Sequence, residues 1–279
     1  MLTTTSTPSC LAAAGPVARH LPGLDDAATV ATRTFQKAQV LLAQTVAVNG
    51  IAAVSGPPGC GKTFAVDHFV RTHPSMPERR WHWLDMPPKP TTKEVTVRLL
   101  DALGEHRPRS ATEYELTELL APALNEGHPV IVIDEAQNLK SGGLQQLRYL
   151  HDRGQGRSWT LVLVGSTVNQ SLNGAAELGS RVSRWVTFTP LTGTEQLLTT
   201  LRDWHPVLAT ASPELLLRVD EVYARGNFRL WAQFLQALLT LSEHQSAGEG
   251  AVDRGDEVDQ NLLVRAALAA VSPSTVRAQ

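Results

Sequence analysis

The stretch that most constrains this chain is the nonapeptide at residues 55–63, Ser-Gly-Pro-Pro-Gly-Cys-Gly-Lys-Thr. It completes the phosphate-loop pattern G-x-x-x-x-G-K-[ST]. Glycine backbones turn tightly enough for successive N–H groups to point at phosphate oxygens, which side chains would obstruct. The lysine supplies a point charge for the β- and γ-phosphates, and the threonine hydroxyl is a ligand for Mg²⁺. We therefore predict a nucleoside triphosphate site formed by Gly56, Pro57, Pro58, Gly59, Cys60, Gly61, Lys62, Thr63 and Phe64.

The sequence around this loop fits a strand–loop–helix unit. Residues 51–54 form an apolar run typical of a buried strand, and residues 63–70 have a helical pattern. The positive end of that helix would face the phosphates. Residues 130–133 and 159–164 are also continuous apolar runs, as expected of parallel strands that are covered on both faces.

The pattern changes after residue 193, where helical stretches follow one another without strands, at 194–205, 213–224 and 227–242. We predict an α/β fold, a P-loop parallel sheet with helices on both faces, followed by a small all-α lid. The predicted parts are a flexible N-terminal arm (1–25), the α/β nucleotide-binding domain (26–192), the lid (193–245) and a mobile tail (246–279) in which 262–271 are helical. Further strands are predicted at 81–86 and 186–188, and further helices at 26–48, 92–103, 112–125 and 144–151.

Composition restricts the binding partners and the cellular compartment that we expect for the chain. The formal net charge of −2 gives no overall basic signature, so a contact with nucleic acid would need a local patch. The two cysteines, Cys10 and Cys60, are far apart in the sequence and one lies in the phosphate loop, so we expect no disulfide. Neither a signal peptide nor an apolar run of about 20 residues is visible, which favours a cytoplasmic protein.

Asp134 and Glu135 follow directly after the apolar run at 130–133. Because ligands of open α/β sheets bind at the carboxyl ends of the strands, this acidic pair should face the phosphates. Asp134 would organise the Mg²⁺ shell, and Glu135 would polarise the attacking water. The alternative, two carboxylates that cap the following helix, is less favoured beside a complete phosphate loop.

Other polar residues allow two interpretations each. Ser166 ends the strand after the acidic pair, where it would sense the γ-phosphate or only cap the next helix. Arg181 and Arg184 precede the short last strand, and either could be an arginine finger for a neighbouring subunit or a solvated charge. Arg229 begins a lid helix and would touch phosphate from the lid side or lie on the surface.

The order of these motifs resembles that of the AAA+ ATPases: Walker A at 56–63, Walker B at 130–135, sensor 1 at 165–166, arginine finger at 181 or 184, and sensor 2 at 226–229. The phrases at 132–139 (VIDEAQNL) and 226–230 (GNFRL) are most similar to the bacterial transposition regulators MuB, TnsC and TniB, a branch that includes the ExeA-type secretion ATPases and is related to the Cdc6/Orc type. This resemblance implies an ATP-dependent homo-oligomer, a ring or filament on double-stranded DNA, that selects target sites and stimulates a transposase.

Within that resemblance, some features disfavour the neighbouring types. No winged-helix pattern follows residue 242, which argues against the origin-binding type, and no peptidoglycan-binding module is visible, which argues against the ExeA type. Sensor 1 is serine where asparagine is commoner. The alternative function is a protein-directed ATPase of the ExeA-like secretion or signalling type. A metabolic P-loop kinase is disfavoured because no acceptor site is visible.

Two groups of residues are candidates for DNA contact. Lys89 and Lys93, with Thr91, lie where the central channel of such an assembly would be, and Arg148 and Arg153 form a second group. Their contacts would be with phosphate, independent of base sequence and sensitive to salt. The alternative for each group is a set of scattered, solvated charges.

Overall fold

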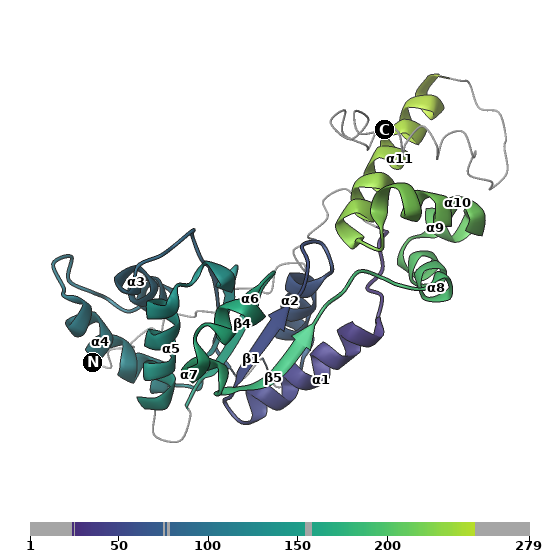
Figure 1. The fold of residues 1–279 in the computed structure, drawn as a ribbon. Coiled ribbons are helices and arrows are strands. Elements are labelled where there is room, and N and C mark those ends of the chain that lie inside the picture. Colours follow the sequence, from purple (N-terminus) through teal and green to yellow (C-terminus); the bar gives the residue numbers. More distant parts are fainter. Residues whose placement is uncertain (1–23, 25, 75, 77–78, 154–157, 249–279) are drawn as a thin grey trace, which may run out of the picture.

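The computed structural model describes residues 24, 26–74, 76, 79–153 and 158–248, with side chains described to residue 244. Except for residue 24, the predicted arm at 1–25 lies outside the described residues. The part of the predicted tail beyond residue 248, with its helix at 262–271, also lies outside them. The described chain contains a sheet flanked by helices and a further cluster of helices beyond it (Figure 1).

The sheet confirms the predicted α/β fold. Its five strands are all parallel and lie in the order β2-β3-β4-β1-β5. Every residue of β1, β3 and β4 is buried, which explains why their sequences are continuous apolar runs. The strands are β1 Ile51–Ser55, β2 Trp81–Asp85, β3 Val130–Asp134, β4 Thr160–Gly165 and β5 Val182–Thr187.

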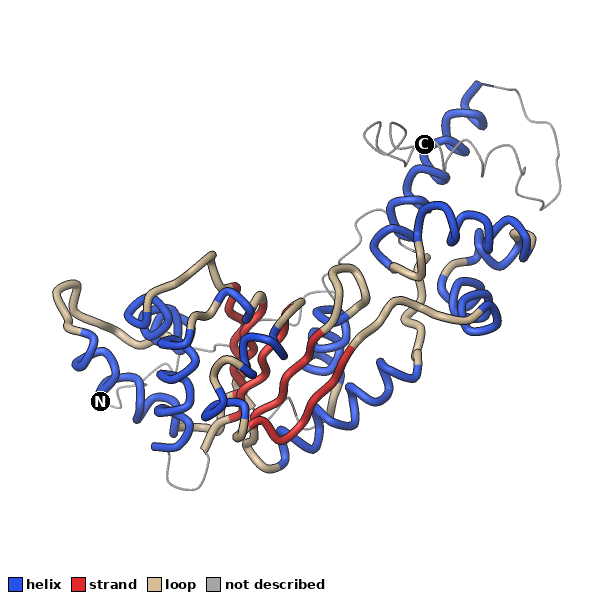
Figure 2. Tube along the Cα trace, in the orientation of Figure 1, coloured by secondary structure: helices blue, strands red, loops and turns tan. Residues whose placement is uncertain are grey.

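Helices cover both faces of this sheet, which appears in red between them in Figure 2. One face packs on α1 (Arg33–Ala47) and α2 (Lys62–Thr72), through buried residues such as Leu42 and Phe69. The other face packs on the remaining helices of this part, with Leu99 and Leu147 in its core. Those helices are α3 Thr92–Leu103, α4 Glu113–Asn125, α5 Ser141–Arg153, α6 Val168–Asn173 and α7 Ala176–Gly179.

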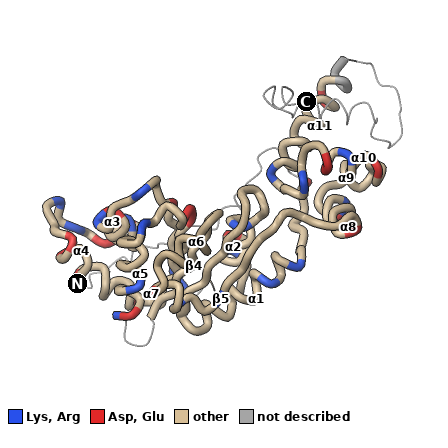
Figure 3. The backbone as a smooth tube through the Cα atoms, in the orientation of Figure 1, with Lys and Arg blue, Asp and Glu red and all other residues tan. Residues whose placement is uncertain are grey.

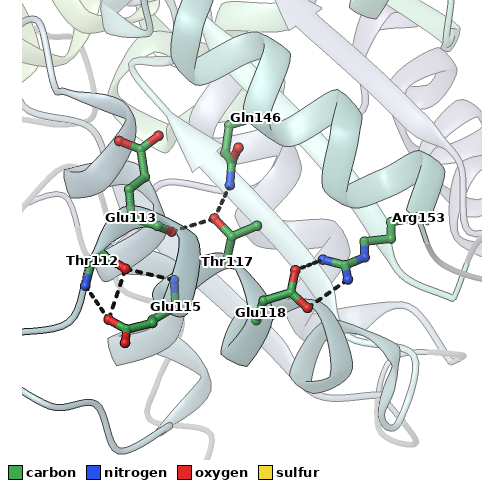
Figure 4. A network of polar contacts seen from close by, with 7 residues as sticks. All are labelled: Thr112, Glu113, Glu115, Thr117, Glu118, Gln146 and Arg153. Carbon is green, nitrogen blue, oxygen red and sulfur yellow. Dashed lines mark hydrogen bonds and ion pairs between the residues drawn. The ribbon is translucent and has the colours of Figure 1, made fainter.

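Capping residues fix the starts of α3 and α4 where the sequence predicted them. The Thr112 hydroxyl accepts a hydrogen bond from the Glu115 backbone N–H, and the Glu115 carboxylate accepts one from the Thr112 N–H at 2.7 Å (Figure 4). Thr91 and Glu94 form the same capping box on α3. Each reciprocal pair satisfies N–H groups that would otherwise lack a partner in the first helical turn.

The lid has its own hydrophobic core, in which Leu201, Leu216, Trp231 and Phe234 are fully buried. One of its helices, α9, was not predicted, because five residues are too short for a periodic pattern to appear. The elements of the lid are α8 Thr194–Trp204, α9 Pro206–Thr210, α10 Pro213–Val219, the π-helical turn η2 Asp220–Ala224 and α11 Phe228–Gly248.

The predicted boundaries that differ most from the structure belong to three elements. The helix expected from residue 26 begins at Arg33, since the preceding segment runs along the lid: the Ala28 N–H donates to the Trp204 carbonyl at 2.7 Å, and Leu24 lies in the lid core. The last strand begins at Val182 rather than 186, because this edge strand alternates buried and exposed residues instead of forming an apolar run. Helix α11 continues to Gly248, past the predicted end at 242.

Candidate nucleotide-binding site

The phosphate loop joins the carboxyl end of β1 to the start of α2. Gly61 is the N-cap residue of α2, in a left-handed conformation, so the helix begins at Lys62. Cys60 is buried beneath the loop, and burial raises the pKa of its thiol. Phe64 lies further from the loop, half-buried, with its ring 6.2 Å from that of Phe35 on α1. The loop therefore has the predicted strand–loop–helix setting.

Lys62 folds back across this loop. Its ammonium group donates a hydrogen bond to the Pro57 carbonyl at 2.7 Å, and the residue is only 8% exposed. Burial lowers the pKa of Lys62, while the negative charges of Asp134 and Glu135 act in the opposite direction. A phosphate bound in the loop would supply the counter-charge that this buried cation lacks.

Asp134 ends β3 beside the loop, as predicted. Its carboxylate accepts hydrogen bonds from the Glu135 backbone N–H at 2.8 Å and from the Thr63 hydroxyl. Burial raises the pKa of Asp134, and the carboxylate of Asp85, its register partner on β2, adds to that effect. Asp85 was not predicted as a site residue, although its position at the end of the adjacent strand was the available signal.

The Thr63 hydroxyl and the Asp134 carboxylate are oxygen donors of the kind that Mg²⁺ prefers. In the described part of the chain no group of three or more His, Cys, Asp or Glu side chains could hold a metal ion by itself. Proteins commonly bind Mg²⁺ through one or two such ligands together with substrate phosphates. The donor set therefore fits Mg²⁺ held jointly with a nucleotide.

Glu135 follows β3 in a left-handed conformation, with φ of 51°. Its carboxylate accepts a hydrogen bond from the Gln137 side-chain amide, whose oxygen in turn accepts the Ser166 backbone N–H at 3.0 Å. The predicted base and the predicted sensor are thus linked by Gln137, which was not predicted as a site residue. The available signal was its position two residues after the acidic pair.

The lid contacts the phosphate loop directly. Asn227 caps α11, because its side-chain oxygen accepts the backbone N–H groups of Arg229 and Leu230 at 3.0 and 3.3 Å. The Arg229 N–H also lies 3.3 Å from the Gly59 carbonyl. A Cβ on Gly59 would come within 2.2 Å of the Asn227 oxygen, so only glycine allows this approach. Arg229 therefore lies beside the loop, as the sequence predicted.

The predicted arginine fingers lie elsewhere. Strand β5 is parallel to β1, so its first residues lie at the amino edge of the sheet, opposite the phosphate loop. Arg181 forms an ion pair with Asp152 at 3.2 Å, and Arg184 donates to the Gln44 side-chain oxygen at 3.0 Å. Arg184 also lies inside β5 rather than before it, which corrects the prediction. The fold does not bring either arginine to the phosphate site of its own chain.

The two groups of candidate DNA contacts differ in their surroundings. Lys89, Thr91 and Lys93 lie before and at the start of α3, where Figure 3 marks basic positions. Neither lysine forms an ion pair with any residue that the structure describes. Arg148 and Arg153 lie on α5 and are both paired. Arg148 contacts Glu177 at 3.3 Å and also Asp152, and Arg153 contacts Glu118 through both carboxylate oxygens, one at 2.8 Å (Figure 4).

Comparisons with known proteins agree with this geometry. Residues 47–170 match the family model described as an AAA domain. No curated protein matches the chain. Among solved structures, Cdc6p from Pyrobaculum aerophilum is 20% identical with a TM-score of 0.64 over 86% of this chain, which spans 65% of that protein. Orc1 from Aeropyrum pernix, in complex with DNA, is 19% identical with a TM-score of 0.64, covering 89% of this chain and 68% of that one.

A RuvB variant from Thermotoga maritima is 13% identical with a TM-score of 0.56, covering 84% of this chain and 70% of that one. At identities this low, structural similarity establishes the fold alone, and the fold is that of the AAA+ P-loop proteins. None of the described helices is long and apolar enough to cross a membrane.

Proposed function

We propose that this chain is an ATPase of the AAA+ type that assembles on double-stranded DNA and regulates DNA transposition. The observation that carries the ATPase proposal is the convergence of Lys62, Thr63, Asp134 and Glu135 at the carboxyl edge of one parallel sheet. A structural metal site or an ordinary helix cap does not require a buried lysine beside two carboxylates. A site that binds a polyphosphate together with its divalent cation requires both.

Each of these residues has a separate role in the proposed reaction. The loop N–H groups and Lys62 bind the phosphates of ATP, and Thr63 and Asp134 hold Mg²⁺. Glu135 accepts a proton from the attacking water. When bound, Mg²⁺ neutralises charge on the phosphate oxygens during transfer. In this proposal, Ser166 and Arg229 respond to the nucleotide from the sheet and from the lid.

The position of the arginines supports the proposed assembly. Arg181 and Arg184 lie at the opposite edge of the sheet from their own phosphate loop, so a finger role for either requires a second copy of the chain. We propose a homo-oligomer, a ring or a helical filament, in which ATP lies between subunits and favours assembly. Hydrolysis would then release the subunits, so that nucleotide acts as a population switch.

The DNA part of the proposal rests on Lys89 and Lys93, with Thr91 between them. In the described structure these lysines are not neutralised by ion pairs, unlike Arg148 and Arg153. Solved structures of similar fold include Orc1 in complex with DNA and a Drosophila ORC bound to DNA. The sequence phrases at 132–139 and 226–230 resemble those of transposition regulators. On that resemblance we propose that the assembly recruits a transposase and target-selection proteins in the cytoplasm.

The test is the ATPase rate with and without double-stranded DNA, at low and at moderate salt. We expect stimulation that falls as salt rises and is lost in a Lys89→Ala/Lys93→Ala variant, because phosphate contacts release counterions. The matched control is Arg148→Ala/Arg153→Ala, which also removes two positive charges but from residues already paired. Equal loss in both double variants would contradict the placement of the contact surface.

A second candidate function is a protein-directed ATPase of the secretion or signalling type. The net charge of −2 favours it, since no excess positive charge attracts nucleic acid from a distance. ATPase activity indifferent to DNA at both salt concentrations, together with stimulation by a protein partner, would support this candidate. The phosphate site would be the same in either case.

A further inference from the structure

We propose that Gln137 is a positioning residue that fixes the carboxylate of Glu135 and couples it to the end of β4. This inference rests on the proposed ATPase function and assigns a role to a residue outside the phosphate-binding motifs. It follows from three observations: the two hydrogen bonds of the Gln137 amide, the attachments of the turn that carries it, and the absence of a side chain at Gly165.

The first observation is that both ends of the Gln137 amide are used. The nitrogen donates to the Glu135 carboxylate and the oxygen accepts the Ser166 backbone N–H at 3.0 Å. A backbone N–H can only donate and a carboxylate can only accept, so the two partners together fix the orientation of the amide. An amide also takes no proton from its neighbour, so Glu135 keeps its ability to accept one from water.

The second observation concerns the one-turn helix η1 (Ala136–Asn138), which follows Glu135. Gln137 ties this turn to the end of β4, and the Asn138 side-chain nitrogen donates to the Met86 carbonyl just after β2, at 2.8 Å. The turn therefore spans the carboxyl ends of three adjacent strands, β2, β3 and β4. A displacement at the end of β4 would be transmitted to Glu135 through a short, doubly anchored path.

The third observation is that Gly165 leaves the space which the amide occupies. A Cβ at this position would lie 1.9 Å from the Gln137 side-chain oxygen and 2.8 Å from a methyl group of Val168. Gly165 does not have a positive φ, so the requirement for glycine here is space and not backbone conformation. The end of β4 is thus shaped around the Gln137 side chain.

The first experiment measures kcat and the dissociation constant for MgATP in Gln137→Ala. We expect kcat to fall by about 10- to 100-fold, part of the roughly 10²- to 10⁴-fold that general base catalysis contributes. The dissociation constant should stay within about twofold, because the hydrogen bonds of the Gln137 side chain reach Glu135 and only the backbone of Ser166, and none reaches the phosphate loop. The control is Gln146→Ala, which removes a glutamine hydrogen bond to Thr117 far from the site (Figure 4).

A second variant, Gln137→Glu, separates positioning from a merely structural role. A protonated carboxyl group can donate to Glu135 and accept from Ser166 as the amide does, whereas an ionised one repels Glu135. The charged groups that interact with its partner Glu135 are Asp134 from β3 and Lys62 from α2. Activity relative to the wild type should therefore be higher near about pH 6 than near about pH 8. A ratio that does not change with pH would contradict the proposal.

A third variant, Gly165→Ala, should displace the amide without removing it. We expect its loss of kcat to resemble that of Gln137→Ala, and the two losses to be non-additive in the double variant, since both act on one interaction. Full additivity, or a Gln137→Ala variant as active as wild type or more active, would overturn the inference. If the wild type itself hydrolysed no ATP with or without DNA, the proposed function would fail instead.

Discussion

Asn227 of the lid donates a hydrogen bond from its side-chain nitrogen to the carbonyl oxygen of Pro58 in the phosphate loop, at 2.9 Å. The same side chain caps α11 through its oxygen. One residue therefore caps the first turn of a lid helix and holds the loop that would receive the β- and γ-phosphates. The conformation of the loop and the position of the lid depend on each other through this contact.

We expect Asn227→Ala to lower the free energy of unfolding by about 1 kcal/mol, the usual loss for an N-cap residue, and also to weaken binding of MgATP. Ser212→Ala is the matched control, since the Ser212 hydroxyl caps α10 away from the loop. Chemical denaturation and a nucleotide-binding titration distinguish the two. If both variants lost stability equally and neither lost affinity for MgATP, Asn227 would be only a cap.

Glu135→Gln should abolish most ATP hydrolysis, by about 10²- to 10⁴-fold, because an amide cannot accept the proton of the attacking water. Binding of MgATP should remain, and the ATP-bound assembly should persist longer in sedimentation or light scattering. Glu118→Gln, at an exposed carboxylate on α4 paired with Arg153, controls for loss of a negative charge. Hydrolysis at the normal rate in Glu135→Gln would contradict the role of Glu135 as base.

Asp134→Asn should stabilise the nucleotide-free protein while impairing its Mg²⁺-dependent activity. Burial raises the pKa of Asp134 above its unfolded value, so its contribution to stability is present below the unfolded pKa and is lost as pH rises through the folded pKa. The gain in Asp134→Asn, about 1 kcal/mol, should therefore appear at neutral and alkaline pH and shrink in acid. Thermal unfolding measured across pH tests this.

Asp101→Asn, at an exposed carboxylate paired with Arg107, is the control for that experiment. A gain for Asp134→Asn that was equally large at low pH would show that ionisation of Asp134 is not its cause.

Mixing of two inactive variants tests whether an arginine acts between subunits. Arg181→Ala keeps an intact phosphate loop, and Lys62→Ala keeps an intact Arg181, so a mixture should regain part of the ATPase activity that each lacks alone. The same experiment with Arg184→Ala decides between the two arginines. Arg148→Ala, which removes the other arginine partner of Asp152, should retain activity by itself. No recovery with either finger variant would contradict a role in the neighbouring site.

Sequence patterns predicted those elements in which successive residues share the same burial or in which a cap lies at a fixed spacing. Buried strands such as β3 and β4 appear as apolar runs because both of their faces are covered, and the threonine caps of α3 and α4 lie three residues before their glutamates. The edge strand β5 lacks that uniform environment, so its start was placed four residues too late. Secondary structure could thus be predicted where adjacent residues are buried or exposed in a regular pattern.

Within the candidate site, the sequence predicted the phosphate loop and the acidic pair, because their chemistry depends on spacing within one segment. Gln137 and Asn227 were not chosen, because their roles depend on partners 29 and 169 positions away. The charges of Arg148 and Arg153 were equally visible, but their ion pairs with Glu177 and Glu118 form only when helices α4, α5 and α7 come together. Long-range pairing is the information that a single sequence does not display.

The segment before α1 gives the lid a second attachment to the sheet. Leu24 is buried in the lid core, Ala28 is hydrogen-bonded to the end of α8, and Thr32 then starts α1 on the sheet. The chain crosses between the two parts again from β5 to α8. Because two covalent segments connect the lid to the sheet, rotation of the lid about the line that joins them is favoured over rotation about any other axis. Lid motion in this protein should therefore follow one defined direction.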